Sequence, residues 1–445
     1  MTYLTFWLND RLGDMNPVGY HAVNLLLHLI AIVLLWEALE PVLPASSRLI
    51  ATGIFALHPF QAETVNYIFA RSALLAAVLC LAAFVCWARG RRWLAVICFA
   101  AALLSKEECA AFPVFLLLWR LAQRRDRKEL LPIATMFVLA LAAGVRVMLA
   151  ARSTVGSGAG AQAGVTPQSY LITQGVVILR YLRMLVLPMG FTVDPDIHVP
   201  SLPVGAAAWL AVLVLAGIAL FRFKNAGAGF WFIAGLVLLL PSSSIFPAAD
   251  LAADRRMYLP MIGFGACAGL LMERMRRAVY IPVLLLLGAL SFGRTATWRN
   301  EESLWSDAVE KAPDKVRPKI QLARYVEPAR AIAILEEAAK LAPSDPAIAA
   351  EEGRVYLSEA RPTDALMQFG RALALAPHDA ANVNNRGAAL LALDQREAAR
   401  ADFERALKID PCQFDARLNL KRMGVAAPAP AGCQFSTAQM KELQK

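Results

Sequence analysis

Charged residues are scarce in this chain of 445 residues. Asp, Glu, Lys and Arg make up only 18% of it and 58% is hydrophobic, and the mean hydropathy is +0.48. A typical soluble globular domain is about 25% charged. The shortage of charge therefore excludes a simple cytosolic enzyme and predicts a protein built largely of membrane-spanning segments.

Three further absences narrow the function. No Gly-rich phosphate loop follows a strand pattern, so a nucleotide-sugar donor is not supported. None of the seven cysteines stands at a zinc-binding spacing, and the proline in Asp194-Pro195-Asp196 favours a turn over a metal-binding pair. The apolar segments hold no inverted repeat and no polar series through their middles, which disfavours a transporter. We assign no metal site and no cofactor from the sequence.

Long apolar runs are present, but only in residues 1–296, which we predict to be a polytopic membrane domain. About 20 predominantly apolar residues cross a bilayer, and ten runs are candidate spans. Those near 49, 93 and 109 are short, so the number is uncertain by one or two. The predicted fold class is all-α, a membrane helix bundle followed by a soluble helical region. The candidate spans lie near 20–38, 49–58, 72–87, 93–104, 109–119, 130–150, 204–221, 229–246, 257–272 and 278–294.

Basic residues are concentrated on one side of these spans. If the N-terminus starts outside, the inner connections hold 14 Lys and Arg in 37 residues and the outer connections hold 7 in 80. The positive-inside rule then places the region after residue 296 on the extracytoplasmic side. Much of the net charge of +10 reflects this orientation, and we expect no nucleic-acid partner. The inner connections are 39–48, 88–92, 120–129, 222–228 and 273–277; the outer ones are 59–71, 105–108, 151–203 and 247–256.

The segment Thr173–Leu187 is apolar but carries Arg180 and Arg183, and both of its ends fall on the outer side in this scheme. We expect an amphipathic helix that lies along the outer leaflet. A re-entrant or true span is the alternative.

The region after residue 296 repeats itself every 34 residues, which is the spacing of tetratricopeptide repeats. Small residues in such repeats let two antiparallel helices approach, and proline ends the second helix. We predict a linker helix at 297–319, an α-solenoid of repeats at 320–425 and a tail at 426–445. The residues related by this step are Pro343, Pro377 and Pro411, then Ala331, Ala365 and Ala399, then Leu335, Phe369 and Phe403, and Gly353 with Gly387.

Two features of the repeat region bear on function. Repeats of this kind are packing modules and also form concave grooves for partners. Asn382, Asn384 and Asn385 are candidates to bind an acceptor peptide there. The alternative is that they are ordinary solvated positions of a helix. Cys412 and Cys433 can pair in an oxidising compartment, with unpaired thiols as the alternative.

Polar residues of the membrane region gather at the outer ends of the spans. Charges inside a bilayer are costly, so their positions point to function. Cations there would neutralise a lipid phosphate, and a carboxylate would take a proton from an acceptor hydroxyl. Taken singly, the same residues are explained by anchoring, turns, or pairing of Lys106 with Glu107. The groups are His58, Gln61, Glu63, Asn66, Tyr67 and Arg71, then Ser105–Glu108, then Asp194 and Asp196, and Asp250, Asp254, Arg255, Arg256 and Tyr258.

Several of these segments together resemble the transmembrane and tetratricopeptide repeat proteins and their bacterial relatives, and the resemblance covers nearly the whole chain. The matching segments are LTFWLNDRLGDMNPVGYHAVNLLLH (4–28), HPFQAETVNYIFARSALLA (58–76), SKEE (105–108), LRYLRMLVLPMGFTVDPD (179–196), DRRMYLP (254–260) and TWRNEESLWSDAV (297–309).

The resemblance implies a GT-C type glycosyltransferase in a plasma (inner) membrane. Such an enzyme moves a sugar from a polyprenyl-phosphate donor to Ser or Thr hydroxyls of extracytoplasmic proteins, with the repeats in the periplasm presenting the acceptor. By the same resemblance and by charge, Arg71, Lys106 and Arg255 are candidates to bind the donor phosphate. His58, Asp254 and Tyr258 are candidates to support them. The partners expected are the lipid-linked sugar, a protein or peptide acceptor, and membrane lipids.

The chain departs from the family at its start. The family's first span and the acidic pair after it lie upstream of the LTFWLN motif, whereas this chain begins almost within that motif. We expect the general base upstream of Met1, with Glu63 and Glu107 as candidates inside the chain. Asp254 also stands where the family usually has Glu. If the chain has lost its base, the alternative function is a non-catalytic membrane scaffold that gathers envelope proteins through its repeats.

Overall fold

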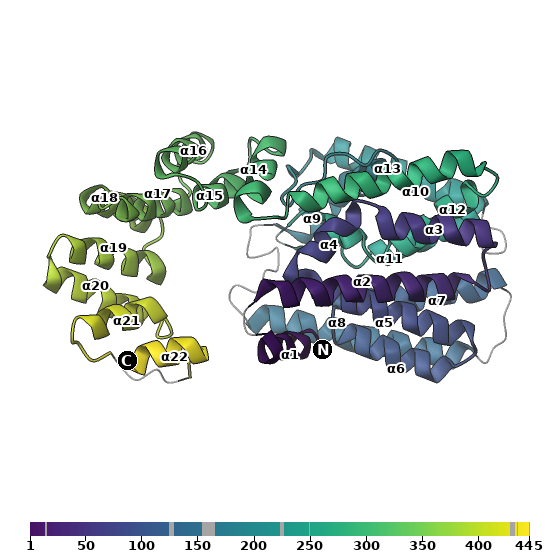
Figure 1. Cartoon of the computed structure of the whole chain (residues 1–445), viewed down its shortest axis with the longest axis horizontal. Coiled ribbons are helices and arrows are strands. Elements are labelled where there is room, and N and C mark those ends of the chain that lie inside the picture. Colours follow the sequence, from purple (N-terminus) through teal and green to yellow (C-terminus); the bar gives the residue numbers. More distant parts are fainter. Residues whose placement is uncertain are drawn as a thin grey trace. The chain divides into compact units, whose positions relative to one another are not determined.

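The computed structural model describes residues 1–13, 16–123, 129–153, 165–222, 227–248, 250–427, 432–433 and 435–444. Parts of the inner connections 120–129 and 222–228 thus lie outside the described residues. The chain forms two compact units, Met1–Arg299 and Asn300–Lys445. The division falls close to residue 296, where the sequence places the end of the membrane region. The regular elements of the described residues are helices, as predicted (Figure 1).

The first unit is a bundle of apolar helices. Among its described residues, six helices are long and apolar enough to cross a membrane: α2 (Pro17–Leu39), η1 with α5 (Ile68–Ala88), α8 over Leu130–Leu149, α9 (Pro167–Val186), α10 (Leu202–Phe221) and α13 (Arg277–Ala296). This is the architecture of a multi-pass membrane protein. The remaining helices are α1 (Thr2–Gly13), α3 (Ala45–Leu57), α4 (Phe60–Asn66), α6 (Arg92–Leu103), α7 (Phe112–Gln123), α11 (Ala228–Leu239) and α12 (Met261–Leu271).

Each of the ten candidate spans overlaps a helix, but five of those helices are short. The helices α3, α6, α7, α11 and α12 have 11 to 13 residues each. At 1.5 Å per residue they extend about 17–20 Å, which is less than the roughly 30 Å of a hydrocarbon core. The span predicted at 229–246 ends at Leu239, where turns replace the helix. The exact number of crossings therefore depends on how the membrane meets these short helices.

The helix α9 is long enough to span a membrane. Three of its side chains donate hydrogen bonds to carbonyls of one loop, which lies between α11 and α12. Tyr170 donates its hydroxyl to the Ser242 carbonyl (2.6 Å), Gln174 donates to Leu251 (3.1 Å), and Tyr181 donates to Ala253 (2.9 Å). That loop joins the C-terminal end of α11 to the start of α12, so it lies at one end of both helices. The helix also packs closely on α10, because a Cβ at Gly175 would lie 2.9 Å from Trp209. Whether α9 lies along the outer leaflet or spans the membrane stays a prediction.

Glycines bring the three helices next to this loop into close contact. A Cβ added to Gly263 of α12 would lie 2.3 Å from the backbone nitrogen of Gly235 in α11, and one on Gly269 would lie 2.4 Å from the carbonyl oxygen of Ser47 in α3. Helices in membranes associate through small residues of this kind. This packing fixes the start of α12, where Arg255 and Arg256 stand in the short helix η5 (Asp254–Met257).

The second unit is a series of helical pairs with the predicted period. Its helices are α14 (Glu301–Lys311), α15 (Val316–Ala323), α16 (Pro328–Leu341), α17 (Pro346–Ser358), α18 (Pro362–Leu375), α19 (Ala380–Ala392), α20 (Arg396–Ile409), α21 (Phe414–Arg422) and α22 (Thr437–Gln444). The repeated small and aromatic positions are buried, including Ala365, Phe369, Ala399 and Phe403 at 0% exposure. The predicted linker 297–319 holds α14 and the start of α15. Cys412 and Cys433 form a disulfide.

The first prediction concerns the repeated glycine. A Cβ at Gly353 in α17 would lie 2.7 Å from the buried ring of Phe369, whereas one at Gly370 in α18 meets nothing within 4 Å. We expect Gly353→Val to lower the free energy of unfolding of the repeats by about 1–3 kcal/mol, and Gly370→Val to change it by less than about 0.5 kcal/mol. Thermal unfolding and limited proteolysis of the full chain measure both. Equal stability of the two variants would contradict the packing described.

Candidate functional site

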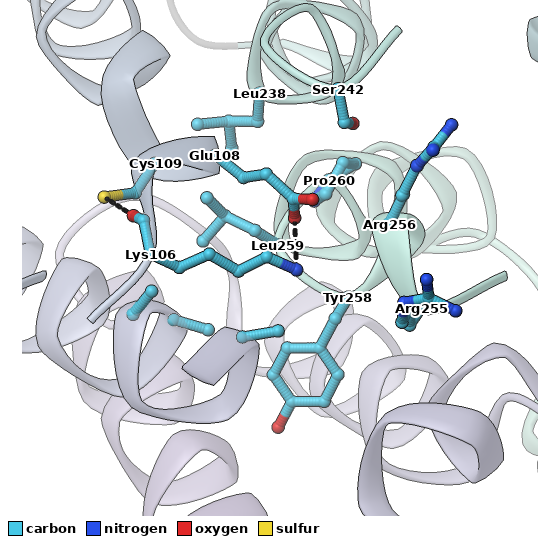
Figure 2. Close-up of a pocket in the computed structure, with 13 residues that line it drawn as sticks. Lys106, Glu108, Cys109, Leu238, Ser242, Arg255, Arg256, Tyr258, Leu259 and Pro260 are labelled. Carbon is cyan, nitrogen blue, oxygen red and sulfur yellow. Dashed lines mark hydrogen bonds and ion pairs between the residues drawn. The ribbon is translucent and has the colours of Figure 1, made fainter. Parts of the chain in front are cut away.

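A small pocket lies among four segments that the sequence places at one face of the membrane region (Figure 2). The first turns of α5 supply Ala73, Ala76 and Ala77, whose small side chains leave space. The connection between α6 and α7, which contains the short helix η2 (Glu107–Ala111), supplies Lys106, Glu108 and Cys109. Leu238 and Ser242 come from the C-terminal end of α11, and residues 255, 256 and 258–260 from the start of α12.

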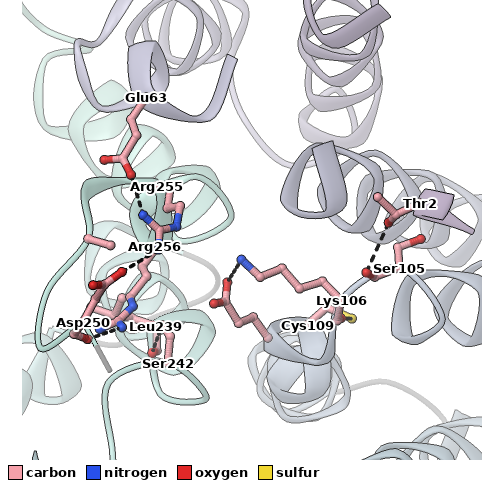
Figure 3. A network of polar contacts seen from close by, with 12 residues as sticks. Thr2, Glu63, Ser105, Lys106, Cys109, Leu239, Ser242, Asp250, Arg255 and Arg256 are labelled. Carbon is pink, nitrogen blue, oxygen red and sulfur yellow. Dashed lines mark hydrogen bonds and ion pairs between the residues drawn. The ribbon is translucent and has the colours of Figure 1, made fainter. Parts of the chain in front are cut away.

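Arg255 stands between two carboxylates (Figure 3). Its Nη1 donates to Glu63 Oε1 at 2.8 Å and its Nη2 donates to Asp250 Oδ2 at 3.0 Å. Glu63 comes from α4 and is only 3% exposed, so this ion pair ties the 58–66 segment to the start of α12. Removing one member of such a buried pair leaves the other charge uncompensated. The three residues thus form one unit.

Burial raises the pKa of Glu63, and the neighbouring Arg255 offsets this shift only in part. The second carboxylate oxygen of Glu63, Oε2, is buried and accepts no hydrogen bond from the residues that the structure describes. Both terminal nitrogens of Arg255 thus donate to carboxylates, whereas Glu63 accepts through one of its two oxygens.

Two further cations of this face, Arg180 and Arg256, are also held. Arg180 of α9 donates to Asp254 Oδ1 at 2.7 Å, so the carboxylate of Asp254 reaches this guanidinium. Arg256 donates to the Tyr170 hydroxyl (3.1 Å) and to the carbonyls of Leu251 (3.2 Å) and Asp250 (2.6 Å). Arg256 is thus a pocket cation whose hydrogen bonds to these described residues go to neutral oxygens.

Lys106 pairs with Glu108 and not with Glu107. Its Nζ lies 2.9 Å from Glu108 Oε2, and the two side chains are 17% and 31% exposed. Figure 2 shows the Lys106 side chain extending across the pocket to meet this carboxylate. Glu107 is exposed and does not line the pocket. The reason is local: Glu107 and Glu108 are consecutive residues of a 3₁₀ helix, where neighbouring side chains lie about 120° apart around the axis, so the two glutamates point in different directions.

The carboxylate of Glu108 experiences all three pocket cations. Burial acts to raise its pKa, but Lys106 and then Arg256 and Arg255 outweigh burial, so the pKa of Glu108 lies below its ordinary value. The pocket therefore holds an anion in a field of three positive charges.

Arg71 lies outside this pocket and is fully buried. Its guanidinium donates to Asn24 Oδ1 (2.9 Å), Asn9 Oδ1 (2.6 Å) and the carbonyls of Tyr20 (2.9 Å) and Thr5 (3.3 Å). These contacts join α1, α2 and α5. The geometry favours a structural role for Arg71 over the expected binding of a donor phosphate.

Tyr258 lines the pocket, but its hydroxyl lies 2.8 Å from Nδ1 of His28. The Nε2 atom of the same ring lies 3.3 Å from the Ala56 carbonyl, so His28 of α2 links α3 to the start of α12. His58 is buried, and its ring stacks on Phe60 with centroids 5.1 Å apart. Both residues support the fold around the pocket.

The cavity measures about 20 Å³, which is room for about one water molecule. A phosphoryl group needs more space, so a side chain must move before one can enter. Lys106 and Glu108 are partly exposed, and they cross the space. Chemically, the site can neutralise an anion with Lys106, Arg255 and Arg256.

The proposed acceptor residues of the repeats have local partners. Asn382 donates to Asp379 Oδ2 at 2.9 Å, as part of the cap of α19. Asn384 donates to Asn385 Oδ1 at 3.2 Å and accepts from Asn419 Nδ2 at 3.0 Å, which links α19 to α21. Asn382 and Asn384 are buried and Asn385 is half-buried. Of the three, Asn385 has the most exposed side chain for a bound peptide.

Comparisons with known proteins point to one activity. The chain is 25% identical over 355 residues to Protein O-mannosyl-transferase F38B6.6 of Caenorhabditis elegans, covering 73% of this chain and 50% of the relative. It is 26% identical over 400 residues to Protein O-mannosyl-transferase TMTC4 of Mus musculus, covering 70% and 53%. These relatives are protein O-mannosyl-transferases. This chain spans about half the length of each. No protein-family model matches it.

A further alignment covers a shorter part of the chain, with 32% identity over 133 residues to Protein O-mannosyl-transferase TMTC3 of Homo sapiens, or 26% of this chain and 14% of the relative. Among solved structures, a chain of the APC/C hetero-tetramer Cut9-Hcn1 aligns with 90% of this chain and 84% of its own length, at 13% identity and a TM-score of 0.28. That score is too low to establish a shared fold.

Three pocket residues received no individual role from the sequence. Arg256 was detectable as a second cation beside Arg255 in a polar connection. Glu108 was detectable only as part of the SKEE run, because nothing in that run distinguishes which glutamate faces Lys106. Ser242 follows Pro241 in an ordinary turn sequence and carries no signal.

The second prediction separates a structural from a binding role for Arg71. Lysine keeps the charge but has three donors on one atom in place of the planar guanidinium, so Arg71→Lys loses contacts that join α1, α2 and α5. We expect the detergent-solubilised full chain to unfold about 5 °C lower, and the exposed control Arg183→Lys to unfold within about 1 °C of the unchanged protein. An unchanged unfolding temperature with weakened binding of a lipid phosphate would restore Arg71 as a donor ligand.

Proposed function

We propose that this protein is a membrane glycosyltransferase that moves a sugar from a polyprenyl-phosphate donor to Ser or Thr hydroxyls of proteins. The named activity of its relatives supports mannose as the sugar and O-linkage as the product. The pocket residues Lys106, Arg255 and Arg256 bind the phosphate of the donor. This phosphate is the leaving group when an acceptor hydroxyl attacks the sugar carbon, with inversion at that carbon, while a general base takes up the hydroxyl proton.

The observation that carries the proposal is the convergence of cations at one pocket. Lys106, Arg255 and Arg256 come from segments separated by about 150 residues, yet all three line the same cavity. Ionisable residues inside an apolar bundle are costly and mark functional sites, and three cations that line one cavity are suited to hold the phosphate of a donor. As the sugar–oxygen bond breaks, negative charge grows on the phosphate, and fixed cations stabilise that charge more in the transition state than in the bound donor.

The remaining polar residues position these cations. Glu63 and Asp250 hold Arg255 in place through its two terminal nitrogens. Tyr170 and two backbone carbonyls hold Arg256. Pre-organised cations lose little freedom when the donor binds, and this lowers the barrier of the step that follows.

The repeats supply the acceptor in this proposal. The helical pairs form a solenoid, and solenoids of this type bind extended segments of other proteins on their concave faces. Asn385 is the most exposed of the three candidate asparagines. The orientation that the basic connections predict places these repeats in the extracytoplasmic, periplasmic compartment.

The third prediction tests the pocket. We expect Lys106→Ala to reduce transfer of radiolabelled mannose from polyprenyl-phosphate mannose to membrane proteins at least tenfold, because the variant loses a mobile cation at the leaving phosphate. Lys106→Arg should retain part of the activity, and the exposed Arg183→Ala should retain all of it. Equal protein levels in the membrane serve as the control. Transfer by Lys106→Ala at the unchanged rate would remove the pocket from the mechanism and favour the scaffold function.

The fourth prediction tests the side on which the repeats lie. Disulfides persist in oxidising compartments, so an extracytoplasmic tail should retain the Cys412–Cys433 bond. After thiols are blocked in intact cells, non-reducing digestion and mass spectrometry should recover the two cysteines as one linked peptide pair. Recovery of both as blocked free thiols would favour a cytoplasmic tail.

A further inference from the structure

The donor pocket contains an anion of its own. Glu108 supplies a carboxylate 2.9 Å from the Lys106 ammonium, in the cavity that Arg255 and Arg256 also line. These are the cations to which the proposed function assigns the donor phosphate. A carboxylate and a phosphate oxygen make the same kind of charge-assisted contact with an ammonium group, so the two compete for Lys106.

We propose that Glu108 is a displaceable substitute for the donor phosphate: its carboxylate occupies Lys106 in the empty enzyme and leaves when a prenyl phosphate binds. This inference rests on the proposed function. It assigns to Glu108 the control of donor affinity, and not a role in bond breaking.

Three observations distinguish this ion pair from the others at the same face. The pair of Arg255 with Glu63 is closed, because Glu63 is 3% exposed and Arg255 is also held by Asp250. Lys106 and Glu108 are instead 17% and 31% exposed and belong to one short connection. Each has a flexible side chain, so Glu108 can turn toward water without disturbing a helix. This is the pair that can open.

The size of the cavity requires such an opening. About 20 Å³ is free beside the Lys106 side chain, which is too little for a phosphoryl group. Figure 3 shows the Lys106 side chain extending from the 105–109 connection toward the side of Arg256. Release of Glu108 would both free a cation and make room.

The position of Glu108 excludes a role as the general base. In an inverting displacement the attacking hydroxyl approaches the sugar carbon from the side opposite the leaving phosphate. A carboxylate that shares its cations with that phosphate lies on the leaving-group side. Glu108 is therefore a positioning residue whose influence is on binding.

The experiment measures binding of farnesyl phosphate to the detergent-solubilised full chain by calorimetry, with farnesol as the ligand that lacks phosphate. We expect Glu108→Gln to bind farnesyl phosphate about threefold more tightly or better, because the competing charge is gone. Glu107→Gln removes the same charge one residue away from an exposed position and should stay within twofold of the unchanged protein. Glu108→Asp withdraws the carboxylate and should give a smaller gain.

The proposal requires that the increase in affinity for farnesyl phosphate depend on Lys106. In the Lys106→Ala background, Glu108→Gln should no longer increase affinity, since the two effects are coupled. Weaker or unchanged binding by a folded Glu108→Gln variant, as judged by its elution profile, overturns the inference. If Lys106→Ala abolishes binding while Glu108→Gln has no effect, the inference fails and the proposed function stands. If neither the unchanged protein nor Glu108→Gln prefers farnesyl phosphate to farnesol, both fail.

Discussion

The cost of keeping charges inside an apolar bundle determines how this protein is built. Each cation at the functional face is held by oxygen atoms: Arg255 by two carboxylates, Arg180 by Asp254, and Arg256 by a hydroxyl and two carbonyls. These contacts are also the ones that join helices distant in the sequence. Arg255 and Arg256, which would bind a donor phosphate, are therefore also residues that hold these helix ends together, and the site cannot form separately from the fold.

The period of 34 residues was enough to predict the repeats, because each repeat must bury the same small and aromatic positions against its neighbour. Hydropathy was enough to predict a helical membrane region. It was not enough to predict the number of crossings, since helices such as α3 and α12 stop after 13 and 11 residues for reasons of packing that a local window does not contain.

The candidate site was predictable as a face but not as a set of contacts. Polar connections that join the spans on one side of the membrane lie at the same face of the bundle. The structure brings residues 63, 106, 250 and 255 together at this face. Which neighbour faces the cavity depends on local backbone geometry. In the 3₁₀ turn that begins at Glu107, consecutive side chains point in different directions, so Glu108 lines the pocket and Glu107 is exposed. Arg71 shows the same limit, because a motif identifies an arginine without showing whether it binds a ligand or joins helices.

The contacts between α9 and the loop from Ser242 to Asp254 have a mechanical consequence. That loop has little regular structure of its own, yet Tyr170, Gln174 and Tyr181 attach it to a helix at three points over about 16 Å. A helix resists bending, so the loop acquires a stiffness that its own backbone does not provide. Arg255 and Arg256 follow directly after this supported stretch, so α9 restrains the backbone that positions two of the pocket's cations.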